Sequence, residues 1–428
     1  RDTDRSRGLG DVYKRQLLDK LGIMYPPAGQ ATSFEEAEAV AAHIGYPLLV
    51  RPSYVLGGRG MMIAYDAEHL RDYMAEAARI SPDYPVYLDR FLEGAIESDV
   101  DALCDGEEVY IGGILEHIEE AGIHSGDSAT CIPPFSFSES LQAKLRETTR
   151  RIAMALGVRG LVNVQYAIKG ETVYVIEANP RASRTVPFIS KATGVPLAKC
   201  AARIMAGDSI ASLGLPSDDR QLDWFCMKEA VMPWGRFPGA DVILGPEMKS
   251  TGEVMGIAKS YPEAYAKTQL AIDYKLPDPS AGKVFISVCD RDKRHILSVA
   301  RILRYLGFDI CSTEGTARVL RGGNVTCEVV EKISGPHDGE RPNIGDLIAD
   351  GKIAVIINTP YGPGSRGDGY LLRTEAVRRG VTCVTAMSAA NTYVSAIEAV
   401  REDQQGHGSA NDMGMDVIAL QDLPQYTV

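Results

Sequence analysis

The feature that most constrains the fold is a regular alternation of short apolar strands and helices after Lys283. Strand-like runs fall at residues 284–288, 309–312, 325–330, 354–358 and 381–385, with a helix predicted at 293–306 and helical segments between the later runs. Repeated strand–helix units form a parallel sheet covered by helices on both faces, and ligands bind at the carboxyl ends of its strands. The sequence therefore predicts an α/β domain with a doubly wound parallel sheet over residues 280–428.

Residues 17–206 show a different pattern, in which helices are mixed with paired strands. A helix is predicted to begin after Ser33, because Ser33 and Glu36 form a capping-box pattern, and to stop at Gly45 and Pro47. Residues 207–279 are rich in Pro and Gly and predict a helical extension, with a helix near 262–269 and a linker at 277–282. The chain thus divides into an α+β domain, an extension and an α/β domain.

Residues 1–16 are not expected to belong to either domain. The segment Asp11–Gln16, DVYKRQ, reverse-translates codon by codon into the end sequence of a transposon used to prepare sequencing libraries. We expect this tail to be an assembly artefact and the first domain to be truncated at its N-terminus. The alternative is a native disordered tail.

The charge balance excludes several classes of partner. The chain carries 57 acidic and 45 basic residues, a formal net charge of -12, whereas a general binder of nucleic acid or anionic membrane needs a basic face. No apolar stretch approaches ~18 uninterrupted residues and no secretory pattern begins the chain, so a cytoplasmic protein is expected. The eight cysteines are scattered without metal-ligand spacing, and we expect them to be reduced and mostly buried.

A predicted β-hairpin carries the most informative polar residues. Strand-like segments at 162–168 and 172–178 flank a short loop, and with the loop centred on Glu171, Gln165 lies opposite Glu177. Asn179 follows on the same face, and such oxygen ligands suit Mg²⁺ or Mn²⁺. A plain solvated face is the alternative. The other face is predicted to be core, and comprises Val162, Val164, Tyr166, Ile168, Tyr174, Ile176 and Ala178.

Two arginines follow this hairpin directly. Arg181 and Arg184 lie three residues apart, and guanidinium groups hold phosphate or carboxylate bidentately. A metal site beside arginines indicates phosphoryl transfer. The glycine turn at 57–60, after Arg51, is a candidate phosphate cover, although most such loops are simple turns. The acids at 97, 99 and 101 alternate along a strand and are equally consistent with a solvated sheet face.

The chain also contains six longer motifs that resemble one family. They are RPSYVLGGRG (51–60), DVDALCDGE (99–107), EHIEEAGIHSGDS (116–128), NVQYAI (163–168), VIEANPRASRTVPFISKATG (175–194) and GPEMKSTGEVMG (245–256). Their order and spacing closely resemble the C-terminal half of the large subunit of carbamoyl phosphate synthetase. The resemblance covers essentially everything after residue 16. It implies an ATP-grasp domain that phosphorylates carbamate, followed by a regulatory domain similar to methylglyoxal synthase.

The resemblance also implies roles for individual residues. Arg181 and Arg184 would be the catalytic pair that holds carbamate and its developing phosphate, while Gln165, Glu177 and Asn179 would hold the divalent metals. ATP, with Mg²⁺ or Mn²⁺ and K⁺ as a further cation, would be the cofactors of a step that feeds pyrimidine and arginine synthesis. Nucleotide contacts would come from Arg51, Arg90, Leu92, Glu97, Gly122, Ile123, His124, Ser125, Gln165 and Glu177.

The α/β domain is similar to the family's receptor for a nucleotide monophosphate. Residues 312–316 close a strand and open a helix, where hydroxyls and backbone N–H groups suit a phosphate. The effector residues implied by the family pocket are Thr313, Thr316, Lys332, Asn358 and Thr359, and the loop 362–369 adds Arg366. Helix caps and a surface loop are the plain alternative. No methylglyoxal synthase activity is expected.

Two departures from the family limit the expected activity. A complete large subunit contains a homologous N-terminal half that makes carbamate and docks the glutaminase small subunit, and both would be partners of this chain. The acidic–basic segment that helps to hold ATP is replaced by the suspect tail. The alternatives are another ATP-grasp ligase, such as a biotin-dependent carboxylase component, or a non-catalytic nucleotide-sensing fragment.

Overall fold

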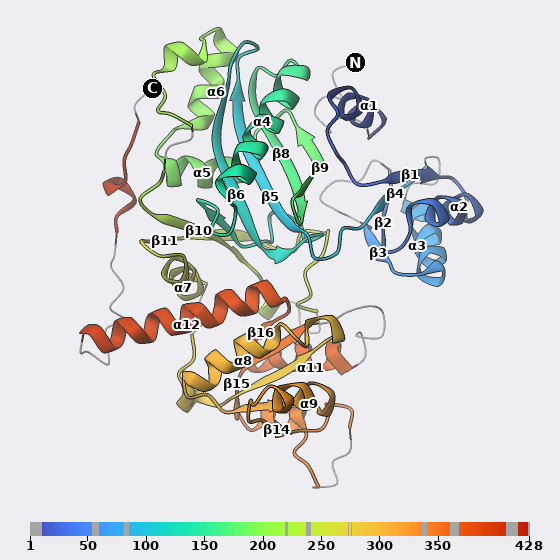
Figure 1. Cartoon of the computed structure of the whole chain (residues 1–428), viewed down its shortest axis with the longest axis vertical. Helices are drawn as coiled ribbons and strands as arrows, with labels where there is room; N and C mark the ends of the chain where they lie inside the picture. Colours follow the sequence, from blue (N-terminus) through green and yellow to red (C-terminus); the bar gives the residue numbers. More distant parts are fainter. Residues whose placement is uncertain are drawn as a thin grey trace.

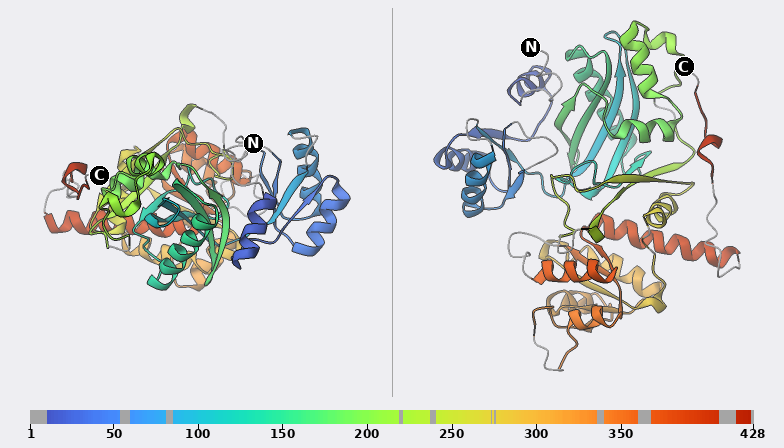
Figure 2. Two further views of the ribbon diagram at one scale, coloured as in Figure 1. Left: turned by 90° about the horizontal axis from the view of Figure 1, so that it is seen from above. Right: turned by 180° about the vertical axis from the view of Figure 1, so that it is seen from behind.

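The structure, a computed structural model, describes residues 11–53, 60–80, 85–218, 221–236, 241–272, 274, 276–335, 340–359, 368–407 and 418–426 (Figure 1). Within these residues the strands form sheets of four, seven and five strands. The small sheet stands to one side of the large one, and the five-stranded sheet lies at the other end of the molecule (Figure 2). Short 3-10 helices occur at Ile210–Leu213, Trp234–Arg236, Pro279–Ala281, Asp290–Asp292 and Leu420–Asp422.

The four-stranded sheet comprises β1 (Ala28–Ala31), β2 (Leu48–Arg51), β3 (Met62–Ala64) and β4 (Val86–Arg90), in the antiparallel order β1-β4-β2-β3. Helices α2 (Phe34–Ile44) and α3 (Ala67–Ile80) pack on it through one apolar cluster. Ser33 caps α2 as predicted, since its side chain accepts from the Glu36 N–H. The Glu36 carboxylate also accepts from the Thr32 N–H at 2.7 Å.

The large sheet is antiparallel throughout, in the order β11-β10-β7-β6-β5-β8-β9. Helix α4 (Glu139–Ala155) covers one face, and α5 (Thr185–Thr193) and α6 (Leu197–Ala206) cover the other. Helix α1 (Asp11–Leu21) includes the segment of suspected artefactual origin. The strands are β5 (Ile96–Cys104), β6 (Val109–Glu120), β7 (Thr130–Ile132), β8 (Gly160–Lys169), β9 (Thr172–Asn179), β10 (Phe225–Val231) and β11 (Gly252–Ala258).

The segment 207–279 differs from the predicted helical extension. It supplies β10 and the edge strand β11 of the large sheet, and β10 pairs with both β11 and β7. The predicted helix near 262–269 is present as α7 (Tyr261–Ala271), which is capped by Ser260. The Pro and Gly content concealed these two strands, and the pairing of Cys226 in β10 with Ile132 in β7, 94 residues earlier, leaves little local signal.

The β8–β9 hairpin has the predicted pairing of Gln165 with Glu177, but a tighter turn. Lys169 pairs with Thr172, and a bulge between Gln165 and Tyr166 restores the register further along the strands. The bulge reverses the faces of β9 near the turn, so that Val173 and Val175 enter the main core. The prediction of Tyr174 and Ile176 in that core is therefore wrong, because both pack instead with the small cluster of Leu92, Ala95, Ala121 and Ala167.

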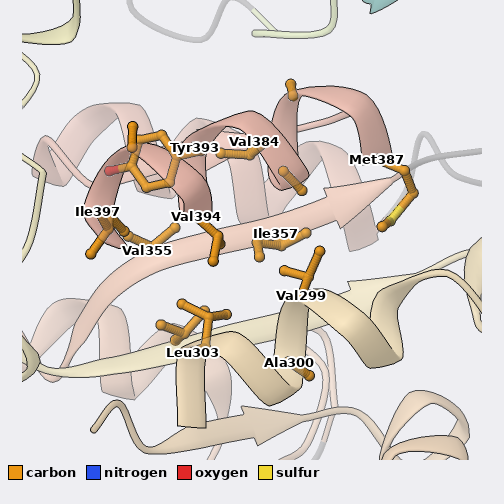
Figure 3. Packing of buried hydrophobic residues seen from close by; sticks show 14 of the residues in the cluster. Val299, Ala300, Leu303, Val355, Ile357, Val384, Met387, Tyr393, Val394 and Ile397 are labelled. Atoms are coloured by element: carbon orange, nitrogen blue, oxygen red, sulfur yellow. The ribbon is translucent and has the colours of Figure 1, made fainter. Parts of the chain in front are cut away.

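The C-terminal block confirms the doubly wound parallel sheet. Its strands β12 (Lys283–Val288), β13 (Ile310–Ser312), β14 (Glu328–Val329), β15 (Ile353–Thr359) and β16 (Thr382–Val384) are parallel in the order β14-β13-β12-β15-β16. Helices α8 (Ile296–Tyr305) and α12 (Met387–His407) pack on the side chains of Val355 and Ile357 (Figure 3). Helices α10 (Ile344–Ala349) and α11 (Asp368–Arg379) cover the other face, and α9 (Glu314–Gly322) follows β13.

The block that contains the large sheet and the C-terminal block that contains the parallel sheet share one apolar core. Helix α12 lies along α7, and side chains from β7, β10 and α7 belong to the same apolar cluster as those of β12, α8 and α12 (Figure 1). The end of the chain returns to the first block, where the Tyr426 N–H donates to the Gly194 carbonyl at 3.0 Å. The predicted domain 280–428 therefore includes a tail that packs on the large sheet's helices.

The structure also shows the state of the cysteines and the character of the helices. All eight cysteines are free, six of them buried. In the described part of the chain, no helix combines the length and the apolar character that a membrane span requires.

Candidate functional site

Two rows of polar side chains cross three neighbouring strands of the large sheet. In the first row Asp99 of β5 pairs with Gln165 of β8, which pairs with Glu177 of β9. In the second row, two residues along each strand, the order is Asp101, Asn163 and Asn179. Because side chains two residues apart point to the same face, all six lie together on one face of the sheet.

Asp99 forms the centre of a buried hydrogen-bonded group. Its Oδ2 lies 2.8 Å from His117 Nε2, and its Oδ1 accepts from Asn163 Nδ2 at 3.2 Å. Burial opposes ionisation of Asp99, but the hydrogen bond and the electrostatic effect of His117 outweigh it and hold the pKa of Asp99 below its ordinary value. Glu97 lies on the other side of the ring, 3.7 Å from His117 Nδ1.

Asp101 lies beneath the loop that carries the two predicted arginines. It is fully buried, and its Oδ1 lies 2.6 Å from Ser183 Oγ while its Oδ2 contacts Thr185 Oγ1. Burial raises the pKa of Asp101 to about 6. The acids at 99 and 101 are thus buried in the site rather than on a solvated sheet face.

The predicted nucleotide loop is held next to Glu97. The Gly122 N–H donates to Glu97 Oε1 at 2.8 Å, and burial raises the pKa of Glu97 to about 6. His124 Nδ1 accepts from the Gly126 N–H at 3.0 Å, so its neutral form carries the ring proton on Nε2, where it can be donated. Burial lowers the pKa of His124, which favours that form. Ile123 is half-buried beside them.

A second loop, residues 241–251, packs against this one. The backbone N–H groups of Lys249 and Ser250 donate to the buried carboxylate of Asp127 at 2.7 and 2.9 Å. The His124 N–H donates to the Gly245 carbonyl at 2.8 Å. Lys228 of β10 also contacts the nucleotide loop, since its Nζ donates to the Ser125 carbonyl at 3.1 Å. The nucleotide loop is therefore fixed from two sides by segments that lie more than 100 residues further along the chain.

The two predicted arginines project into solvent at the end of β9. Arg181 Nη1 donates to the Ala182 carbonyl at 3.1 Å, and Arg184 contacts Met248. In the part of the chain that the structure describes, neither guanidinium pairs with a carboxylate. Arg184 and His124 both lie against Gly126, so the structure brings the arginine loop and the nucleotide loop together.

Three predicted nucleotide residues lie on or beside the small sheet. Arg51 ends β2 and pairs through Nε with Asp89 at 2.5 Å, and Arg90 ends β4 and donates to the Tyr46 carbonyl. Leu92 is buried in the small cluster with Ala121, next to the Glu97–Gly122 contact. Helix α1 joins the two sheets, since Arg15 approaches Asp89 at 3.5 Å and Lys14 donates to a carbonyl of β9. The predicted glycine turn lies outside the described residues, apart from Gly60.

The predicted metal ligands provide one carboxylate and two amides. Glu177 is exposed and makes no hydrogen bond or salt bridge within the described residues, whereas Asn179 is buried at 3% exposure. An exposed carboxylate facing an amide oxygen fits a hard cation. No group of three His, Cys, Asp or Glu side chains suited to a metal occurs in the residues that the structure describes, so the set remains a prediction.

Four of the five predicted effector residues meet at the carboxyl edge of the parallel sheet. Thr313 precedes α9 and lies 3.2 Å from Ser287 Oγ, and Thr316 Oγ1 accepts from the Val288 N–H at 3.3 Å. Asn358 Nδ2 donates to the Ser287 carbonyl at 2.9 Å, and Thr359 follows it. Lys332 lies further out, where it is 65% exposed and pairs with Asp368 at 3.4 Å. Arg366 lies outside the described residues.

Sequence reasoning placed only Glu97 of β5 in the site and missed the other residues that β5, β8 and β10 contribute. Asp99, Asp101 and Asn163 complete the two rows, and Lys228 supports the nucleotide loop. The alternation of the acids was a signal for Asp99 and Asp101, but only the pairing of β5 with β8 shows that this face is covered. Nothing in the local sequence marks Lys228.

Comparisons with known proteins identify the families of both parts of the chain. Residues 12–213 match the family described as carbamoyl-phosphate synthase L chain, ATP binding domain, and residues 295–385 match the MGS-like domain. Two solved structures share the fold of the first part. The biotin carboxylase domain of 2-oxoglutarate carboxylase from Hydrogenobacter thermophilus has 18% identity and a TM-score of 0.51 over 63% of this chain and 66% of its own. Carboxyaminoimidazole ribonucleotide synthase from Aspergillus clavatus has 16% identity and a TM-score of 0.50 over 63% of this chain and 72% of its own.

The fold and the site therefore define an ATP-grasp domain joined to a methylglyoxal synthase-like domain. The carbamoyl phosphate synthase large chain of Methanothermobacter thermautotrophicus is 54% identical over 90% of this chain and 36% of its own length. That of Mycobacterium tuberculosis is 50% identical over 95% of this chain and 37% of its own length. The chain belongs to the carbamoyl phosphate synthase large-chain family, and it spans little more than a third of the length of these relatives.

Proposed function

We propose that this chain carries out the ATP-dependent phosphorylation of carbamate, which yields carbamoyl phosphate and ADP. A carbamate oxygen attacks the γ-phosphorus in line, forming a new O–P bond as the bond to the leaving ADP oxygen breaks. The observation that carries this proposal is the pair of polar rows, Asp99–Gln165–Glu177 and Asp101–Asn163–Asn179, beside the His124 loop and the two exposed arginines.

The residues of the site divide the work of such a step. Arg181 and Arg184 have no carboxylate partners among the described residues, so their charge is available to carbamate and to the transferring phosphoryl group. His124 presents an Nε2 proton from a fixed loop. Glu177, Gln165 and Asn179 would hold Mg²⁺ or Mn²⁺, which when bound supplies positive charge near the phosphates. K⁺ is proposed as a further cation.

The rest of the proposed enzyme follows from the length of the relatives. Since the chain spans 36% of the Methanothermobacter protein, we infer that a further half of a large subunit supplies carbamate and docks a glutaminase subunit. Carbamoyl phosphate would then feed pyrimidine and arginine synthesis in the cytoplasm. We also propose that the carboxyl edge of the parallel sheet binds a nucleotide monophosphate, because the hydroxyls of Ser287 and Thr313 meet there at the start of α9, beside the Asn358 carboxamide of β15.

The reverse reaction tests the function most directly. Carbamoyl phosphate and MgADP are mixed with the chain, and ATP is followed with a coupled assay. We expect ATP formation that Glu177→Gln reduces by ~10²-fold or more, because that change removes the only carboxylate of the predicted cation site. Glu171→Gln is the matched control, since Glu171 is exposed at the turn of the same hairpin and should leave the rate unchanged.

A second candidate function has a separate outcome. If calorimetry detects uridine or inosine monophosphate binding while the unaltered chain forms no ATP, the chain is a non-catalytic nucleotide sensor. A biotin-dependent carboxylase component finds support only in a shared fold at 18% identity, and we do not propose it.

A further inference from the structure

We propose that Asp101 is a positioning residue, which holds the Arg181–Arg184 loop in its working geometry through a closed ring of hydrogen bonds with Ser183 and Thr185. The ring joins Asp101 Oδ1 to Ser183 Oγ at 2.6 Å, Ser183 Oγ to Thr185 Oγ1 at 2.7 Å, and Thr185 Oγ1 to Asp101 Oδ2. The kinetic part of this inference rests on the function proposed above, whereas the structural part does not.

The ring clamps Arg184 from both sides. Ser183 and Thr185 flank it in sequence, and both hydroxyls are bound to the same buried carboxyl group. Ser183 Oγ also accepts from the Val186 N–H at 3.2 Å, which ties the loop to the first turn of α5. On the other side of the loop the Arg181 N–H donates to the Asn179 carbonyl at 2.8 Å, at the end of β9. The backbone of both arginines is therefore anchored to the polar rows.

This backbone anchor matters because, within the described residues, no carboxylate aims the guanidinium groups. Both arginines are exposed, Arg181 donates to the Ala182 carbonyl, and Arg184 contacts Met248 and lies against Gly126. A side chain without a carboxylate partner takes its position from its Cα and its neighbours. Since a displacement of about 1 Å in a positioning group costs ~10²-fold in rate, a loosened loop is expected to lower kcat.

The ring also sets a requirement on hydrogen atoms. Three oxygen–oxygen contacts need three hydrogens, and the two hydroxyls supply two. A protonated Asp101 supplies the third, and burial favours that form by raising the pKa of Asp101 to about 6, with a smaller contribution from the charge of Asp99. When Asp101 is ionised, both hydroxyls donate to its carboxylate oxygens instead. A carboxamide at position 101 also offers one donor and one acceptor, so Asp101→Asn can close the same ring, whereas Asp101→Ala cannot.

The test compares four variants of the full chain in the ATP-forming assay and in hydrogen exchange. We expect Asp101→Ala to lower kcat by ~10²-fold with the KM for ADP within about 3-fold, and Asp101→Asn to stay within about 10-fold of the unaltered chain. Ser183→Ala should fall between them. Thr149→Val is the matched control, because it removes a buried hydroxyl that pairs with Tyr166 at 2.6 Å among the apolar side chains of the opposite face.

Hydrogen exchange of the peptide 180–190 provides a readout that is independent of turnover. We expect its protection to be lost in Asp101→Ala and retained in Asp101→Asn and Thr149→Val. The proposal is overturned if Asp101→Ala leaves kcat or this protection unchanged, if Asp101→Asn is as impaired as Asp101→Ala, or if Thr149→Val lowers kcat equally. Should the unaltered chain form no ATP, the proposed function fails, and the exchange measurement alone decides whether the ring holds the loop.

Discussion

The salt bridge between Arg373 and Asp241 offers a quantitative test of how the two blocks are joined. Arg373 of α11 is fully buried, and it donates to the two carboxylate oxygens of Asp241 at 2.7 and 2.8 Å. Its third contact is Asn358 Oδ1 at 2.9 Å. Asp241 belongs to the loop that packs on the nucleotide loop, so this pair connects the parallel sheet with the ATP-grasp domain.

The burial of the two partners predicts an asymmetry between their substitutions. Removing one partner of a buried ion pair costs about 3–5 kcal/mol, because the other charge stays uncompensated. Asp241 is 24% exposed and can regain water, so Arg373→Met should cost about 3 kcal/mol. Arg373 has no exposed surface, so Asp241→Ala should approach 5 kcal/mol.

Denaturation in guanidinium chloride, followed by tryptophan fluorescence, measures this difference. The chain has two tryptophans, and Trp234 begins the 3-10 helix Trp234–Arg236, which contacts α11. A loss of 3 kcal/mol shifts the midpoint by roughly 0.5–1 M. Lys352→Met is the control, since the Lys352–Asp350 pair is more than half exposed on both sides and should contribute less than about 1 kcal/mol. A cost below about 1 kcal/mol for Arg373→Met, or a smaller cost for Asp241→Ala than for Arg373→Met, would refute the reasoning.

Two further predictions concern pH and the C-terminal tail. Burial, and then the charge of Glu229, raises the pKa of Glu119 above its ordinary 4.5, so the folded chain retains a proton that the unfolded chain releases. Stability should therefore fall as the pH rises from 4.5 towards the raised value, and Glu119→Gln should flatten this fall in thermal denaturation between pH 6 and 9. Gly194 has φ 71°, and a Cβ there would lie 1.7 Å from the Pro424 carbonyl oxygen. Gly194→Ala should release residues 418–426 to limited proteolysis, whereas Gly214→Ala, with φ 64° and no atom within 4 Å, should not.

The sequence predicted those parts of the site that depend on neighbouring residues. The pairing of Gln165 with Glu177 follows from alternation and a short loop, and the structure contains it. The bulge beside Gln165 was not predictable, because the extra residue on β9 is stabilised by packing on two different clusters. The turn is one residue tighter than predicted, and the bulge adds one residue to β9, so the two differences cancel. The pairing of Gln165 with Glu177 was therefore predicted correctly from a turn that the structure does not have.

The failure to predict Asp99 and Asp101 of β5 as site residues has a different cause. Asp99 lies 66 residues before Gln165, with which it pairs, and Asp101 lies 62 residues before Asn163. No local pattern encodes such a pairing. The alternating acids are compatible with a solvated face until α5 is known to cover that side. Long-range pairing therefore converts a predicted surface into the buried centre of the site.

The loop 241–251 gives a physical basis for coupling between the two ends of the molecule. Asp241 is held by Arg373, while Lys249 and Ser250 hold Asp127 beside His124. Asn358 donates to the carbonyl of Ser287 and accepts from Arg373, so a ligand that competes for Asn358 at the proposed effector edge must replace one of these contacts. Such a ligand would change the contacts that hold Arg373, and therefore the position of Asp241. Asp241 begins the loop 241–251, whose other end binds the nucleotide loop through Lys249 and Ser250. A coupling free energy of about 1–3 kcal/mol is typical of such two-site linkage, and this salt bridge is strong enough to transmit it. Arg373→Met should therefore remove the effect of a bound nucleotide monophosphate on the KM for ADP while leaving its binding to the effector edge measurable by calorimetry.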